Sequence, residues 1–197
     1  AIEASSGLTV TGAGITLGNV TALGGNASVQ STLGASVGIV TANAGTITVG
    51  AASGNASASR FVTSGANGAS LSAAGGNATL DTGSVGGDLS IAATGPGANR
   101  TAAITGTTSV GGNLVASGQR IALGDDAGTE TISAVGFIDV TATAGDIIGG
   151  AGLTLTAGST GSAAGPLFLD ASGNILFDAS SAANGVAGFG VRLGAGG

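Results

Sequence analysis

The acidic residues are the only side chains of this chain suited to acid–base chemistry near neutral pH. His, Cys and Lys are absent from all 197 residues, which excludes Ser–His, Cys–His and lysine-based nucleophiles and the usual zinc ligands. Some glycoside hydrolases need only two carboxylates, and Asp125-Asp126 is the only adjacent acidic pair. We expect this pair to lie at a solvated corner, with Arg120 and Glu130 as surface partners, and we expect no enzymatic activity.

A group of oxygen-bearing side chains near the C-terminus resembles part of a calcium loop. Asp170, Ser172 and Asn174 alternate along the chain, and Asp178 follows. Calcium loops place oxygen ligands at alternate positions and close with a bidentate Glu at the twelfth position, where this chain has Ser181. Asp170, Asn174 and Asp178 are therefore weak calcium candidates. We expect Asp170 and Asp178 to end successive strands instead, without any metal or cofactor.

Five asparagines stand in Asn-X-Ser/Thr sequons and are candidate glycosylation sites. They are Asn19, Asn26, Asn55, Asn77 and Asn99. The first four also belong to a turn-and-strand unit, described below, in which Asn makes the turn and Ser or Thr faces outward. Structure alone explains those four sequons.

Threonine pairs of the form Thr-X-Thr suggest a different function, because a flat threonine ladder on a β-solenoid is an ice-binding arrangement. Such pairs begin at Thr9, Thr46, Thr129, Thr141 and Thr154. An ice-binding face needs one pair per coil in register, and none occurs between residues 53 and 104. An ice-binding solenoid is therefore a less favoured alternative.

The composition excludes several classes of protein. Only 7% of the residues are charged and 41 are glycine, whereas an ordinary globular domain has about 25% charged residues. Disordered chains combine low hydrophobicity with high net charge, but here the mean hydropathy is +0.53 and the net charge −6. Four arginines without lysine make a nucleic-acid partner improbable. No basic segment followed by an apolar run begins at Ala1 and no stretch of about 18 apolar residues occurs, so we expect neither a signal peptide nor a membrane span in these residues. The absence of cysteine suits export.

One unit recurs eight times: Gly, then Asn or Asp, an apolar residue, any residue, and usually a second apolar residue. Gly and Asn tolerate positive φ, and the Asn side chain can satisfy local backbone groups, so the pair predicts a turn. The alternation of apolar residues with Ser or Thr that follows predicts a short strand with one buried face. The eight turn pairs are Gly18-Asn19, Gly25-Asn26, Gly54-Asn55, Gly76-Asn77, Gly87-Asp88, Gly112-Asn113, Gly145-Asp146 and Gly173-Asn174.

These short strands predict an all-β fold, a parallel β-solenoid without helices. The apolar residues are aliphatic, with few of the large aromatics that dominate β-sandwich cores. Similar strands return about every 19 to 25 residues, which suits one coil of two or three strands and gives roughly eight to ten coils. We expect residues 1–197 to form a single solenoid segment, with loop insertions at 95–99 and 158–165.

Two stretches of the chain resemble the filamentous-haemagglutinin type of secreted exoprotein, the large adhesins of two-partner secretion. They are residues 112–123 (GNLVASGQRIAL) and 167–177 (LFLDASGNILF). The resemblance implies a right-handed parallel β-helix, an outer-membrane export partner, and work outside the cell in attachment or biofilm formation. The secretion domain of that family and its Asn-Pro motifs are missing here. The chain is then part of a longer repetitive protein or fibre, or belongs to another solenoid lineage.

The function expected from these features is structural. The chain would be the stalk or display rod of a secreted or cell-surface bacterial adhesin, facing a host or neighbouring-cell surface and its glycans. A subunit that associates end to end into an extracellular filament is the main alternative. A carbohydrate-active β-helix is less favoured.

Overall fold

The computed structural model describes residues 1–97, 99–125, 129–158, 165–177, 185–187 and 191–195. Within these residues the chain forms strands and connecting corners, with no helix. The strands pair in parallel and wind into a β-solenoid. The predicted fold class is confirmed, and the nine strands of the sheet described next, one from each turn (here called a coil), agree with the roughly eight to ten coils expected.

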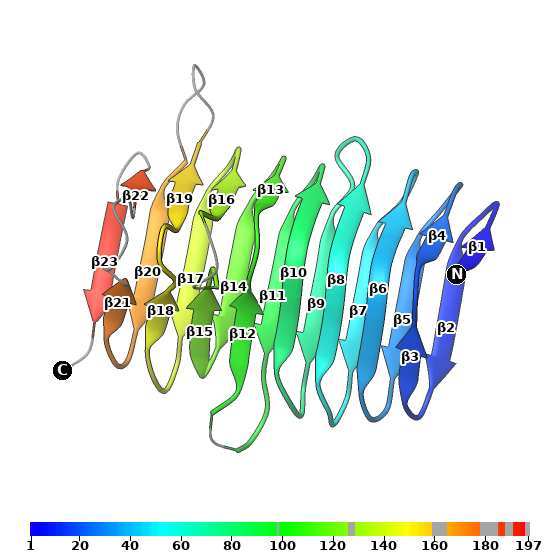
Figure 1. Ribbon diagram of the computed structural model, residues 1–197, viewed down its shortest axis with the longest axis horizontal. Helices are drawn as coiled ribbons and strands as arrows, with labels where there is room; N and C mark the ends of the chain where they lie inside the picture. Colours follow the sequence, from blue (N-terminus) through cyan, green and yellow to red (C-terminus); the bar gives the residue numbers. More distant parts are fainter. Residues whose placement is uncertain (98, 126–128, 159–164, 178–184, 188–190, 196–197) are drawn as a thin grey trace.

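One face of the solenoid is a sheet to which each coil contributes a single strand. This nine-stranded sheet has the order β2-β5-β7-β9-β11-β14-β17-β20-β23, and Figure 1 shows the strands following one another along the long axis. The strands are β2 (Leu8–Gly12), β5 (Ala27–Ser31), β7 (Ile47–Ala51), β9 (Ala69–Ala73), β11 (Leu89–Ala93), β14 (Leu114–Gly118), β17 (Ile138–Ala142), β20 (Leu167–Ala171) and β23 (Val191–Ala195).

The rest of each coil belongs to a fourteen-stranded sheet. In most coils two short strands form this part, and in three coils a single eight-residue strand replaces them. The strands are β1 (Ile2–Ala4), β3 (Ile15–Leu17), β4 (Val20–Ala22), β6 (Ala35–Ala42), β8 (Ala56–Thr63), β10 (Ala78–Val85), β12 (Thr101–Ile104), β13 (Thr108–Val110), β15 (Arg120–Leu123), β16 (Thr131–Ala134), β18 (Ile147–Gly149), β19 (Thr154–Ala157), β21 (Ile175–Phe177) and β22 (Gly185–Ala187).

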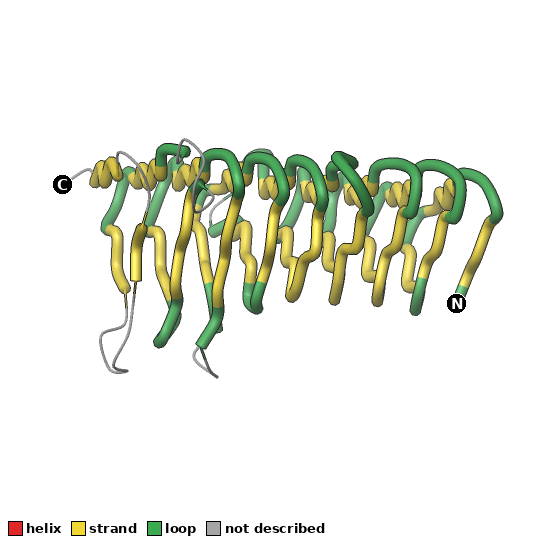
Figure 2. Tube along the Cα trace, turned by 90° about the horizontal axis from the view of Figure 1, so that it is seen from above, coloured by secondary structure: helices red, strands yellow, loops and turns green. Residues whose placement is uncertain are grey.

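Strands keep their register from coil to coil although the coils differ in length. Equivalent corner residues are 20 positions apart between Asn26 and Thr46, and 28 apart between Asp146 and Asn174. The extra residues lie at corners, as the insertion at 95–99 between β11 and β12 illustrates. The predicted insertion at 158–165 connects β19 to β20, and its residues 159–164 lie outside the described part. Figure 2 shows the corners lined up along the molecule.

The core is a column of aliphatic side chains between the two sheets. In β7, Ile47 and Val49 are buried while Thr48 between them is half-buried, as the alternation predicts. Phe61 is the one aromatic side chain fully buried among the described residues. Inward residues stack on those of the next coil, as Ile47 does on Ala69, so the interior consists of columns of small and medium aliphatic side chains.

Candidate functional site

The eight Gly-Asn and Gly-Asp pairs all lie at positions that connect strands. Each pair is followed directly by a strand, as predicted: β4, β5, β8, β10, β11, β14, β18 and β21. Most of the pairs precede a strand at one of two corners of the coil, whereas Gly18-Asn19 lies between β3 and β4 within the fourteen-stranded sheet. The turn residues predicted from the sequence are thus where the chain changes direction.

The expectation that these pairs adopt positive φ was wrong. Positive φ occurs at Gly65, Gly95, Gly97, Gly124, Gly152, Gly158 and Asn99 within the described residues, and at none of the sixteen residues of the pairs. Most glycines of the Gly-Asn and Gly-Asp pairs are needed because the preceding coil leaves no room for a side chain. A Cβ atom on Gly76 would collide with Oδ1 of Asn55, and one on Gly112 with Oδ1 of Asp88.

The Asn and Asp side chains bond to the neighbouring coil and not to their own turn. The N–H of Thr46 donates to Oδ1 of Asn26 over 2.9 Å, and the N–H of Asn77 donates to Oδ1 of Asn55 over 2.9 Å. The same bond runs from the Asn113 N–H to Asp88 over 2.7 Å. The Oδ1 atoms of Asn77, Asn113 and Asp146 in turn accept such a bond from a backbone N–H of the following coil. These side-chain oxygens continue the inter-coil ladder through the corners, where the extended strand ends.

The acidic pair considered for catalysis agrees in part with its predicted surroundings. Asp125 is exposed, and Asp126 lies outside the described residues. Glu130 is buried, with 7% of its surface exposed, so it is no surface partner. Arg120, which is exposed, forms an ion pair with the half-buried Asp146 over 3.8 Å. The prediction that Glu130 lies at the surface was therefore wrong, but the residue does lie near this corner, since a Cβ atom on Gly124 would be 3.2 Å from Oε2 of Glu130. Arg120 as a partner of the acidic pair stays a prediction.

The calcium candidates do not assemble around a common point in the described part of the chain. Asp170 lies on the outer face of β20, whereas Asn174 lies at the following corner, where its side-chain amide donates to Asp146 over 3.4 Å. Asp178 lies outside the described residues. No group of three or more potential metal-ligating side chains is present among the residues searched.

The five sequon asparagines are all exposed. Asn19, Asn26, Asn55 and Asn77 accept inter-coil hydrogen bonds through Oδ1. Asn99 lies in the corner between β11 and β12 with a φ of 67°. The glycosylation of these sites stays a prediction.

The Thr-X-Thr pairs are distributed over different faces. Thr9 and Thr48 lie in the nine-stranded sheet, whereas Thr131 and Thr154 lie in the fourteen-stranded sheet. These pairs therefore do not build one ladder with a pair in every coil.

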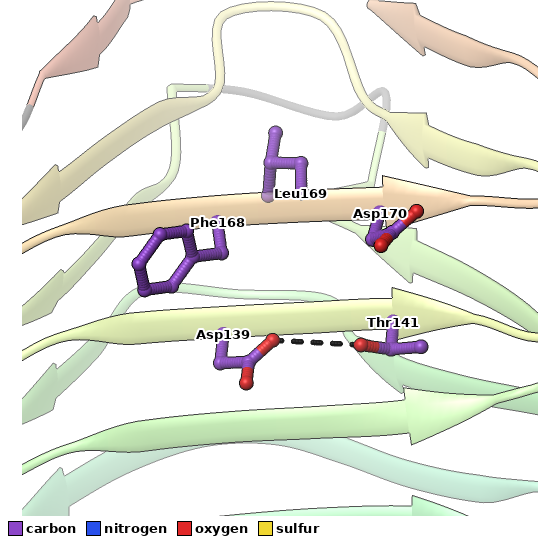
Figure 3. A pocket seen from close by; sticks show the side chains of 5 residues that line it. All are labelled: Asp139, Thr141, Phe168, Leu169 and Asp170. Atoms are coloured by element: carbon purple, nitrogen blue, oxygen red, sulfur yellow. Dashed lines mark hydrogen bonds between the residues drawn. The ribbon is translucent and has the colours of Figure 1, made fainter. Parts of the chain in front are cut away.

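A hollow of about 250 Å³ on the outer face of the nine-stranded sheet brings together residues that the sequence did not group. Its lining consists of Asp139 and Thr141 on β17 and Phe168, Leu169 and Asp170 on β20. Asp139 lies opposite Phe168 in the register, and Thr141 lies opposite Asp170. The four outward side chains thus form a two-by-two arrangement, here called the outer tile (Figure 3).

The outer tile combines an aromatic ring with hydrogen-bonding groups. Phe168, Asp139 and Thr141 are half-buried, Asp170 is exposed, and Leu169 is buried beneath them. The Thr141 hydroxyl donates to Oδ1 of Asp139 over 3.4 Å. On the next coil, a Cβ atom on Gly194 would lie 3.2 Å from Oδ1 of Asp170, so the missing side chain leaves room for this carboxylate.

No family model, curated protein or solved structure matches this chain. The resemblance to filamentous-haemagglutinin-type exoproteins therefore stays a prediction. In the described part of the chain, no helix is long and apolar enough to cross a membrane.

Proposed function

We propose that the chain is a structural and adhesive extracellular β-solenoid, the stalk or display rod of a bacterial surface adhesin. In this role it is secreted or held at the bacterial surface, depends on an outer-membrane export partner, and faces host or neighbouring cells. The chain contributes reach and a surface for display, and it has no catalytic role.

The observation that carries this proposal is the continuity of the hydrogen-bond ladder along one axis. Backbone bonds join successive coils at the corners as well as within strands: the Leu8 N–H donates to the Asn26 carbonyl over 2.8 Å, and the Leu114 N–H to the Phe137 carbonyl over 2.9 Å. A solenoid whose coils contact only their neighbours grows in one direction as coils are added. That geometry suits a spacer whose length is set by its number of coils.

The outer surface supports the same role. Outward residues at equivalent positions of the nine-stranded sheet form a column along the solenoid, and Asp139 belongs to one such column. In the first five coils this column consists of hydroxyl side chains: Thr9, Ser28, Thr48, Ser70 and Ser90. Hydroxyl side chains of this kind are hydrated and uncharged. A rod that protrudes into the medium benefits from these properties.

One observation favours a second candidate, a self-assembling filament. β2 and β23 are the outermost strands of the nine-stranded sheet, so each has one side without a strand partner within the described chain. An open strand edge is a template for pairing with another chain. A second copy stacked on either end would continue the solenoid.

Sedimentation velocity and electron microscopy of the purified chain distinguish the two candidates. The display-rod proposal predicts one monomeric species whose sedimentation coefficient does not rise with protein concentration. Regular fibres, with coils repeating about every 4.8 Å along their axis, would contradict it and favour the filament.

A further inference from the structure

We propose that the outer tile, formed by Asp139, Thr141, Phe168 and Asp170, is a binding site for one pyranose ring of a saccharide. This inference rests on the proposed display role, because it names the class of ligand that the rod would meet on another cell. It concerns a specific place on the rod, whereas the display role depends on the whole ladder.

The outer tile interrupts a uniform surface. The column that carries hydroxyl groups in the first five coils continues as Val115, Asp139 and Phe168. An aromatic side chain on the outside of a short strand gains less from burial than one in the core. The fully buried aromatic of the core, Phe61, shows where such a ring packs best in this fold. The outward position of Phe168 is therefore better explained by a ligand than by packing.

The chemistry of the lining specifies what the ligand must supply. Ionised carboxylates only accept hydrogen bonds, so a ligand over Asp139 and Asp170 has to bring donors. The ring of Phe168 offers an apolar face beside them. A pyranose has hydroxyl donors around its rim and a face of C–H groups, which matches both requirements.

The dimensions of the outer tile agree with a single sugar ring. Adjacent strands lie about 4.8 Å apart, and outward residues two positions apart along a strand are separated by about 6.8 Å. The hollow above them has a volume of about 250 Å³. It is small and lies on a flat face, so we expect weak binding to one ring and stronger attachment only through many copies.

A cationic ligand is the main competitor, because two carboxylates and an aromatic face also attract a positive charge. The two classes of ligand differ in the contact they make with Phe168, because a pyranose presents its C–H face to the ring and a cation presents its charge. The cationic probe in the experiment below distinguishes them.

Saturation-transfer NMR with the whole chain tests the site. The probes are the methyl glycosides of glucose, galactose, mannose and N-acetylglucosamine, with Nα-acetyl-argininamide as the cationic probe. We expect at least one glycoside to receive saturation, most strongly at its ring C–H protons. Phe168→Ala should weaken its binding about tenfold, since the apolar contact is lost. Asp170→Asn should weaken it severalfold without changing the shape of the site.

Val115→Ala is the matched control, because Val115 faces outward in the same column but lies outside the hollow. It should leave glycoside binding unchanged. Saturation transfer that is equal in the wild type and Phe168→Ala, or signals from the cationic probe alone, would overturn the inference, as would the absence of any glycoside signal. A monomeric rod that binds no glycoside would leave the display role intact, whereas fibres would remove that role whatever the sugar result.

Discussion

Asn and Asp are interchangeable at the corners because the ladder uses only one side-chain oxygen. Oδ1 of Asn55 and Oδ1 of Asp88 accept the same kind of inter-coil N–H bond, over 2.9 and 2.7 Å. The Gly before the next corner residue gives that oxygen room. Gly followed by Asn or Asp is thus a unit that stacks on its own copies, which explains why it recurs in so irregular a sequence.

Gly112→Ala tests whether space, and not backbone conformation, requires glycine at these corners. Its Cβ atom would meet Asp88 of the preceding coil, whereas a Cβ atom on Gly18 would have nothing within 4 Å. We expect Gly112→Ala to lower the free energy of unfolding by about 1–3 kcal/mol and Gly18→Ala to be nearly silent. Thermal and chemical denaturation of both variants provide the comparison. Equal losses would show that close approach is not the cause.

Individual strands could be predicted from the sequence because the signal for a strand is local. In β17 and β20 the alternation of the sequence matches the burial found: Ile138, Val140, Leu167 and Leu169 are buried, and Asp139 and Phe168 between them face outward. Register between coils is not local, since the coils vary in length by several residues. The outward positions of Asp139 and Phe168 on their own strands could therefore be predicted from the sequence. Their position opposite each other on neighbouring strands could not. The burial of Glu130 was missed for the same reason.

The inward and outward assignment of the strands predicts unequal effects of substitution. Leu89 and Ile147 are fully buried, at 1% and 0% exposure, whereas Thr154 is half-buried on the outside of β19. Leu89→Asp or Ile147→Asp would bury a charge without a partner and should lower stability by at least about 3 kcal/mol. Thr154→Ser should change it by less than about 0.5 kcal/mol. Similar melting temperatures for Ile147→Asp and Thr154→Ser would contradict the assignment.

At the scale of the whole molecule, length follows from the number of coils. With about 4.8 Å between coils, the nine stacked strands of the nine-stranded sheet span about 38 Å. Insertions at corners lengthen the chain without lengthening the rod, because the extra residues leave the register of the strands unchanged. A stalk built this way tolerates variation at its corners while keeping its reach.

Distances between spin labels test the stacked, in-register solenoid most directly, and the absence of cysteine allows clean labelling at introduced sites. Thr11, Ala92, Ser117 and Thr141 share one outward column of the nine-stranded sheet, linked through Gln30, Gly50 and Ser72. Three double-cysteine variants carry one label at position 11 and the other at position 92, 117 or 141. The two labels are then separated by four, five and six coils, respectively. The solenoid predicts backbone separations of about 19, 24 and 29 Å, a constant increment per coil. Distances that do not increase by about 4.8 Å from each of these pairs to the next would contradict it.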